Sequence, residues 1–203
     1  EMIVPGGAKA TLADTMCFKG MLGCVWSQPL PPYDPEGARK LLAEAGYPNG
    51  FDIAFTAQQV VKDAATAVAG DLRRIGIRAT MEVATLVIFR KKRSEGSLEL
   101  FAGYYPNGSF PYVDNALDVF FGDESRDYTR DRYITERFEA ARRIHDPQQQ
   151  TVLYREVFDR MNEQAYYVPI SSLPVMWAHS RDVRLAANPI SANKSDIGDF
   201  FWN

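Results

Sequence analysis

The sequence predicts an α/β fold in which a mixed sheet is flanked by helices. Segments that alternate apolar and polar residues, as strands do, are interleaved with segments that repeat apolar residues every three or four positions. Strands that alternate with helices of this length favour layers of helices packed on a sheet. The composition is that of an ordinary globular protein, since 46% of the 203 residues are hydrophobic and 24% are charged.

The first helix is expected directly after an irregular lead-in. Residues 1–34 end in a cluster of prolines, which cannot lie in a helix interior. Asp34 can then cap the free amide groups of a helix, Pro35 suits its first position, and Glu36 suits the positive end of its dipole. Gly46 is expected to end this helix.

After the first helix, the sequence continues to alternate between predicted strands and predicted helices. We expect strands at residues 51–55, 77–83, 98–102, 166–170 and 175–178. We expect helices at residues 61–74, 85–93, 130–145 and 148–163, with Asp114 and Asp118 near the start of a further helix. Pro147 separates the last two long helices, because proline disfavours helical geometry in the residue before it.

Charge and motif content narrow the classes of function. The 23 basic and 26 acidic residues are spread along the chain and give a net charge of −3, so no nucleic-acid partner is expected. No apolar run approaches the roughly 18 residues of a membrane-spanning helix. His145 and His179 lie far apart, and none of the H-E-x-x-H, G-x-S-x-G, Walker A or G-x-G-x-x-G motifs occurs. We therefore expect no metal, no cofactor and no enzymatic activity.

The two cysteines leave two interpretations open. Cys17 and Cys24 are too few for a four-ligand zinc site and lack the C-x-x-C spacing of redox motifs. A disulfide that closes a small loop would fit an oxidising compartment. Two buried free thiols fit the sequence as well.

Three segments resemble the peptide/nickel-type (family 5) solute-binding proteins of ABC transporters. Residues 33–51 combine the capping, helix and turn chemistry of one recurrent stretch of that family. Residues 71–77, where a helix passes into a strand, and residues 166–170 resemble two others. The similarity extends over nearly the whole chain.

The resemblance implies a periplasmic-binding-protein-like lobe, namely the second lobe (lobe II) of a two-lobed protein that closes over a solute. Residues 1–34 would lead in from a missing lobe I, residues 35–184 would form the α/β domain of lobe II, and residues 185–203 would be the returning C-terminal segment. The implied partners are a small-molecule or peptide solute, an ABC permease in the membrane, and lobe I of the same protein. The implied location is periplasmic or extracytoplasmic. Any export signal is expected outside this sequence, because the apolar run at residues 2–5 is too short for a signal-peptide core.

Residues 103–111 resemble the ligand loop of the family. Peptide-binding relatives carry Gly-Trp-x-x-Asp-x-x-Asp/Glu-Pro there, with an aspartate that pairs with the amino terminus of the peptide. Tyr104 stands at the tryptophan of that pattern, Asn107 at the aspartate and Phe110 at the second acid. We expect Tyr104, Tyr105, Asn107 and Phe110 to contact the ligand. Since a neutral amide cannot balance a buried ammonium, a neutral, sugar-like or aromatic ligand is expected rather than a free peptide amino terminus.

Other interpretations stay open from the sequence. The aromatic residues of the loop could pack beneath an ordinary turn. The chain could be the ligand-binding lobe of a sensor, which a fused signalling domain would favour, or a free-standing interaction module. A hydrolase or transferase of unknown mechanism is a third class, although it lacks a paired nucleophile and base.

Overall fold

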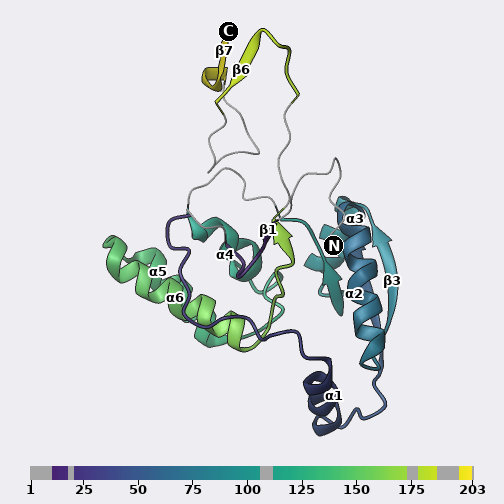
Figure 1. Ribbon diagram of the computed structural model, residues 1–203. Helices are drawn as coiled ribbons and strands as arrows, with labels where there is room; N and C mark the ends of the chain where they lie inside the picture. Colours follow the sequence, from purple (N-terminus) through teal and green to yellow (C-terminus); the bar gives the residue numbers. More distant parts are fainter. Residues whose placement is uncertain (1–10, 18–20, 106–111, 173–177, 187–196, 203) are drawn as a thin grey trace. The chain divides into compact units, whose positions relative to one another are not determined.

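The computed structural model describes residues 11–17, 21–105, 112–172, 178–186 and 197–202 (Figure 1). The chain separates into two compact units. Unit 1 contains Pro32–Tyr105, and unit 2 contains the described residues of Val4–Pro31 and those that follow residue 111. The boundary at residue 105 lies inside the domain predicted at residues 35–184. The predicted division into residues 1–34, 35–184 and 185–203 stays a prediction.

Unit 1 is built on a three-stranded parallel sheet. The central strand is β2 (Asp52–Gln58), with β3 (Arg78–Ala84) on one side and β4 (Leu100–Ala102) on the other. The register places Asp52 opposite Arg78 and Gln58 opposite Ala84. The last four residues of β2 are buried, as expected for a central strand that is covered on both faces. The predicted α/β fold, with helices flanking a sheet, is therefore confirmed, and this sheet is parallel where a mixed sheet was predicted.

Helices connect these strands in the predicted order. They are α1 (Pro35–Glu44), the 3-10 turn η2 (Gln59–Val61), α2 (Lys62–Arg74) and α3 (Leu86–Ser94). Asp34 caps α1 as expected, because its carboxylate accepts a hydrogen bond from the Gly37 amide at 2.9 Å. Ala65 of α2 is fully buried and packs with Phe55 and Ala57 of β2 in the core of this unit.

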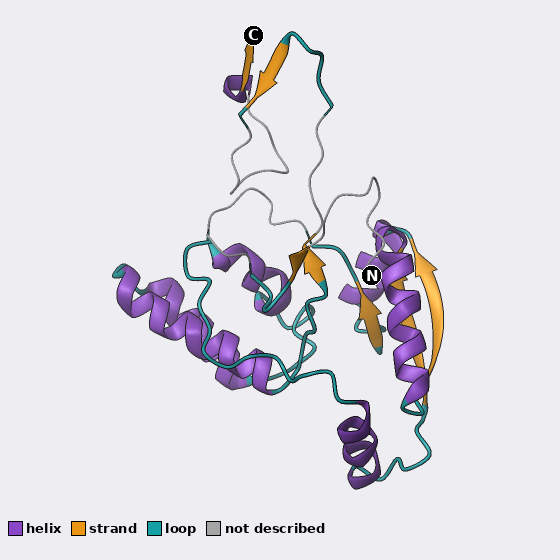
Figure 2. Ribbon diagram, viewed as in Figure 1, coloured by secondary structure: helices purple, strands orange, loops and turns teal. Residues whose placement is uncertain are grey.

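Unit 2 is built mainly on helices. They are α4 (Val113–Phe121), α5 (Arg132–Arg143) and α6 (Pro147–Glu163). Figure 2 shows α5 and α6 lying against each other. The most deeply buried side chains of this unit come from all three helices and include Val113, Leu117, Ile134, Phe138, Tyr154, Val157, Phe158 and Met161. The helices predicted at residues 130–145 and 148–163 are confirmed to within two residues at each end. In the described part of the chain, no helix is long and apolar enough to cross a membrane.

Short antiparallel strand pairs complete unit 2. Strand β1 (Thr11–Leu12) pairs with β5 (Ser171–Ser172). Strand β6 (Val183–Leu185) pairs with β7 (Phe200–Trp202), which follows the 3-10 turn η3 (Ile197–Asp199). The prediction of an irregular lead-in over residues 1–34 was incomplete, because this segment contains β1.

The strand predicted at residues 166–170 is wrong. This segment is not a strand, and β5 begins only at Ser171. The Tyr166 amide closes the end of α6 by donating to the Met161 carbonyl at 3.2 Å, and Pro169 has no amide hydrogen to donate to a neighbouring strand. Most of the strand predicted at residues 175–178 lies outside the described residues.

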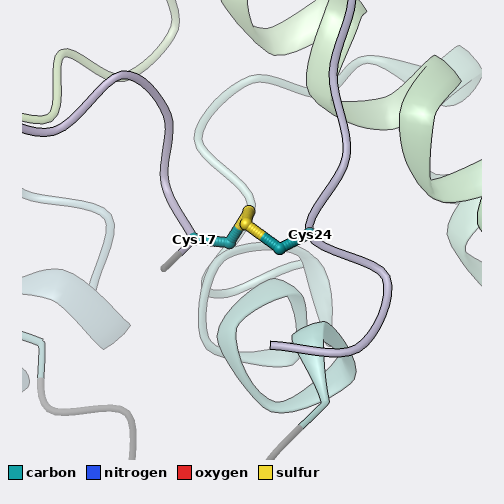
Figure 3. Close-up of a disulfide and its surroundings, with 2 residues drawn as sticks. All are labelled: Cys17 and Cys24. Carbon is teal, nitrogen blue, oxygen red and sulfur yellow. A yellow bond between two sulfur atoms is a disulfide. The ribbon is translucent and has the colours of Figure 1, made fainter. Parts of the chain in front are cut away.

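The two cysteines are joined in a disulfide within unit 2 (Figure 3). The S–S distance is 2.00 Å and the Cα atoms are 5.7 Å apart. The Cys17 side chain is buried. Of the two interpretations that the sequence left open, the structure contains the disulfide.

The end of α6 yields a first prediction. Ala165 has a φ of +48°, in the left-handed region where a Cβ costs about 1–2 kcal/mol, whereas the equivalent position after α3 is Gly96 with a φ of +66°. We expect Ala165→Gly to raise the free energy of unfolding by about 1–2 kcal/mol in urea denaturation. Gly96→Ala is the reverse control, because nothing lies within 4 Å of its added Cβ, and should lower stability by a similar amount. A lower stability for Ala165→Gly would contradict this assignment of strain.

Candidate functional site

The three parallel strands of unit 1 end at one edge of the sheet, and this edge carries the candidate binding residues. Strand β2 ends at Gln58, β3 at Ala84 and β4 at Ala102. In open parallel α/β sheets, ligands bind outside the carboxyl ends of the strands. Tyr104 and Tyr105 follow β4 almost directly, so the loop that carries them starts at this edge.

Gln58 contacts the start of this loop. Its side chain is buried, with 4% of the residue exposed, and its Oε1 accepts a hydrogen bond from the Tyr104 amide at 3.2 Å. A Cβ added to Gly103 would lie 3.0 Å from Gln58 Nε2 and 3.0 Å from Cε2 of the Tyr105 ring. The loop backbone at Gly103 therefore passes tightly between the Gln58 amide group and the Tyr105 ring.

Arg93 contacts the same loop from helix α3. Its side chain is buried, and its guanidinium carbon lies 5.5 Å from the centroid of the Tyr105 ring. At this separation a guanidinium is attracted to the face of an aromatic ring. Tyr104 and Tyr105 themselves are only half-buried. The edge thus carries two partly exposed tyrosines, of which the Tyr104 backbone is bonded from β2 and the Tyr105 ring is contacted from α3.

The described charges near this sheet are mostly paired. Glu82, near the end of β3, forms an ion pair with Lys92 of α3 at 2.5 Å. At the opposite end of the sheet, Asp52 pairs with Arg78 at 2.8 Å, and the hydrogen bond from Arg78 holds the pKa of Asp52 below its usual value. Glu99 accepts a hydrogen bond from the Ala54 amide. Within the described ranges, no three His, Cys, Asp or Glu side chains are grouped so that they could hold a metal ion.

The structure describes only part of the predicted ligand loop. Tyr104 and Tyr105 lie at the carboxyl edge of the sheet, whereas Asn107 and Phe110 lie outside the described residues. Contact of all four with ligand stays a prediction. Sequence reasoning missed Gln58 and Arg93. Gln58 could have been noticed as a polar residue at the end of a central strand. Nothing in the sequence pattern distinguishes Arg93 from its basic neighbours on α3.

Comparisons with known proteins agree on one family. The profile of the family "Bacterial extracellular solute-binding proteins, family 5 Middle" matches residues 7–127, more than half of the chain. The chain is 31% identical over 153 residues to heme-binding protein A of Haemophilus influenzae. This alignment covers 69% of the chain and 28% of that protein. The chain is also 27% identical over 172 residues to the glutathione-binding protein GsiB of Salmonella typhimurium. This second alignment covers 75% of the chain and 32% of that protein. The chain thus spans about a third of the length of these relatives.

Solved structures show the same fold. HbpA2 from Haemophilus parasuis matches with a TM-score of 0.74 at 26% identity, over 98% of this chain and 41% of that one. A dipeptide-binding protein from Pseudoalteromonas sp. SM9913, in complex with Met-Leu, matches with a TM-score of 0.80 at 20% identity, over 96% of this chain and 40% of that one. The family profile, the curated relatives and the shared fold lead to one conclusion: the chain belongs to the bacterial extracellular solute-binding proteins of family 5.

Proposed function

We propose that the whole protein is the substrate-binding component of an ABC importer and that this chain supplies its lobe II. In this proposal the protein captures a small solute, such as a peptide or another organic molecule, in a cleft between two lobes and does not convert it. The observation that carries the proposal is the family match over residues 7–127, within which Tyr104 and Tyr105 start a loop at the carboxyl edge of a parallel sheet. The protein would act outside the cytoplasm and deliver its solute to a membrane permease.

The ligand loop indicates the chemistry of the solute. Tyr104, Tyr105 and Phe110 offer flat apolar faces for stacking, and Asn107 offers both N–H donors and a carbonyl acceptor on one amide group. Arg93 brings a positive charge behind Tyr105. We therefore propose a ligand that is aromatic or sugar-like and does not depend on a free ammonium group for binding.

The proposal predicts that a solute raises the melting temperature of the full-length protein. Differential scanning calorimetry would compare reduced glutathione, hemin, the dipeptide Met-Leu, mannopinic acid and glucose. A ligand at a hundred times its Kd stabilises the folded state by about 2.7 kcal/mol, which is a shift of a few degrees. The 203-residue chain alone should show no shift, because an interlobe cleft needs both walls.

The variant Asn107→Asp tests the ligand class. Restoring the carboxylate should improve binding of Met-Leu, whose ammonium would gain a counter-charge, by about tenfold or more. An unchanged preference would contradict the proposed ligand chemistry. If no compound of any class stabilises a well-folded full-length protein, the importer function is contradicted and an interaction or signalling module is favoured.

A further inference from the structure

We propose that Gln58 is a positioning residue for the ligand loop. Its buried carboxamide takes over as a hydrogen-bonding partner where the pairing between β2 and β4 ends, and it fixes the direction in which Tyr104 and Tyr105 leave the sheet. The importance of this loop for binding rests on the function proposed above. The contacts of Gln58 with the loop are structural observations that do not depend on that function.

The strand pairing ends one residue before Gln58 on the side of β4. Pairing between β2 and β4 runs from Phe55 opposite Leu100 to Ala57 opposite Ala102, whereas pairing between β2 and β3 continues to Gln58 opposite Ala84. Two residues beyond the end of β4, the Tyr104 amide donates to Gln58 Oε1 at 3.2 Å. A side chain thus supplies the partner that a longer β2–β4 ladder would have supplied. An amide left without a partner at this half-buried position would weaken the local structure.

Gln58 also restricts the loop sterically. Its Nε2 lies 3.0 Å from the position of a Cβ on Gly103, and the same position lies 3.0 Å from the Tyr105 ring. On α3, the Arg93 guanidinium lies 5.5 Å from the centroid of that ring. Gln58 and Arg93 are 4% and 8% exposed, so both side chains are themselves confined by their surroundings. Two confined groups therefore contact the loop from two different elements.

This arrangement explains a buried carboxamide at the end of β2. Burying an amide group is unfavourable unless it is hydrogen-bonded, so the Tyr104 amide offsets the cost of burying Gln58. A loop that is held before the ligand arrives loses less conformational freedom on binding, which raises affinity. The geometry therefore assigns Gln58 a role in affinity, although its side chain is almost wholly buried.

Gln58→Leu in the full-length protein tests the role, because leucine has nearly the same size and no acceptor. We expect hydrogen exchange of the Tyr104 amide to become about tenfold faster. We expect affinity for whichever of Met-Leu, reduced glutathione, hemin, mannopinic acid and glucose binds the unmodified protein to fall about tenfold in isothermal titration calorimetry. Gln58→Glu keeps an acceptor oxygen and should restore most of the Tyr104 protection. Gln148→Leu makes the same chemical change on the exposed surface of α6 and should alter neither quantity.

The readouts separate positioning from general stabilisation. Unchanged Tyr104 exchange in Gln58→Leu would overturn the proposal, and so would faster exchange spread evenly over β2 and α2. Gly103→Ala provides a second variant if Gln58→Leu does not fold, because its Cβ would press on Gln58 Nε2 and on the Tyr105 ring. This variant should also weaken binding, and unaltered affinity would count against the proposal. If no probe binds the unmodified protein, the importer function is contradicted, and Tyr104 exchange alone decides whether Gln58 holds the loop.

Discussion

Gly50→Ala is expected to lower the free energy of unfolding of unit 1 by about 2–5 kcal/mol. Gly50 has a φ of +69°, and a Cβ there would lie 1.8 Å from the carbonyl oxygen of Gly76 and 2.3 Å from its carbonyl carbon. The left-handed conformation costs an alanine about 1–2 kcal/mol. The overlap adds a further 1–3 kcal/mol, because the neighbouring atoms are backbone and cannot rotate away.

Both sides of this close approach are held in place by their neighbours. The Ile77 amide donates to the Leu72 carbonyl at 3.0 Å, which fixes the turn that contains Gly76 after α2. Two residues beyond Gly50 and Gly76, the strand register begins with Asp52 opposite Arg78. Relief of the overlap must therefore disturb either the end of α2 or the start of the sheet.

Gly46→Ala is the matched control for Gly50→Ala. Gly46 has a φ of +90°, but nothing lies within 4 Å of its added Cβ, so only the backbone term of about 1–2 kcal/mol is expected. Urea unfolding followed by circular dichroism would measure both variants. The three tryptophans, at positions 26, 177 and 202, lie outside unit 1 and are poor reporters of its unfolding. Equal losses in the two variants would show that the contact with Gly76 adds nothing to the backbone strain.

Asp131→Ala is expected to lower the free energy of unfolding of unit 2 by about 3 kcal/mol. The Asp131 side chain is only 9% exposed and accepts three hydrogen bonds. The Tyr133 amide donates at 2.9 Å and caps α5, Arg160 Nε of α6 donates at 2.8 Å, and the Tyr166 hydroxyl donates at 2.9 Å. One carboxylate thus connects the start of α5, the side of α6 and the segment after α6. Its removal deletes three hydrogen bonds at once, each contributing about 1 kcal/mol, and this costs more than losing a single exposed ion pair.

The same carboxylate makes the stability of unit 2 depend on pH. Burial alone would raise the pKa of Asp131, but the hydrogen bonds from Arg160, Tyr166 and Tyr133 outweigh burial and hold the pKa below its usual value. A carboxyl group whose pKa is lower in the folded state stabilises the fold above its unfolded pKa of about 3.9, and this stabilisation is lost as the pH falls through the folded pKa. The stability difference between the unmodified protein and Asp131→Asn should therefore be constant near pH 7 and shrink below about pH 4.

Urea unfolding between pH 7 and pH 3 would measure this difference. Glu124→Gln is a suitable control, because it replaces an exposed carboxylate of the same unit. A difference for Asp131→Asn that is as large at pH 3 as at pH 7 would contradict the proposed electrostatic contribution. It would assign the role of Asp131 to packing and neutral hydrogen bonding instead.

Local chemistry determined the helices, and the sequence therefore predicted them well. Asp34 and Asp146 each precede a proline, and each carboxylate accepts hydrogen bonds from amides of the first helical turn. The capping residue, the proline and the first turn lie within a few residues of one another, so their pattern can be read directly. Strands β2 and β3 were predicted from the alternation of apolar and polar residues, although the last four residues of β2 are all buried.

Contacts between residues that are distant in the sequence determined the segments that were not predicted correctly. Residues 166–170 have the composition of a strand, yet the Tyr166 hydroxyl is bonded to Asp131, 35 residues earlier. Strand β1 is two residues long and exists only through its pairing with Ser171 and Ser172. A segment this short has no pattern of its own, because the hydrogen bonds that define it come from the other end of the unit.

In the candidate site, too, some residues were predicted from the sequence and others were found only in the structure. The sequence alone singled out Tyr104 and Tyr105, because the run of residues that contains them resembles a family motif over consecutive positions. Only the tertiary structure brought Gln58 to the Tyr104 amide across 46 residues and placed Arg93 beside Tyr105. The physical reason is that parallel strands place their carboxyl ends at one edge of a sheet, whatever the length of the chain between them. A motif of neighbouring residues can be read from the sequence, whereas the groups that hold it in place are known only once the strands have been paired.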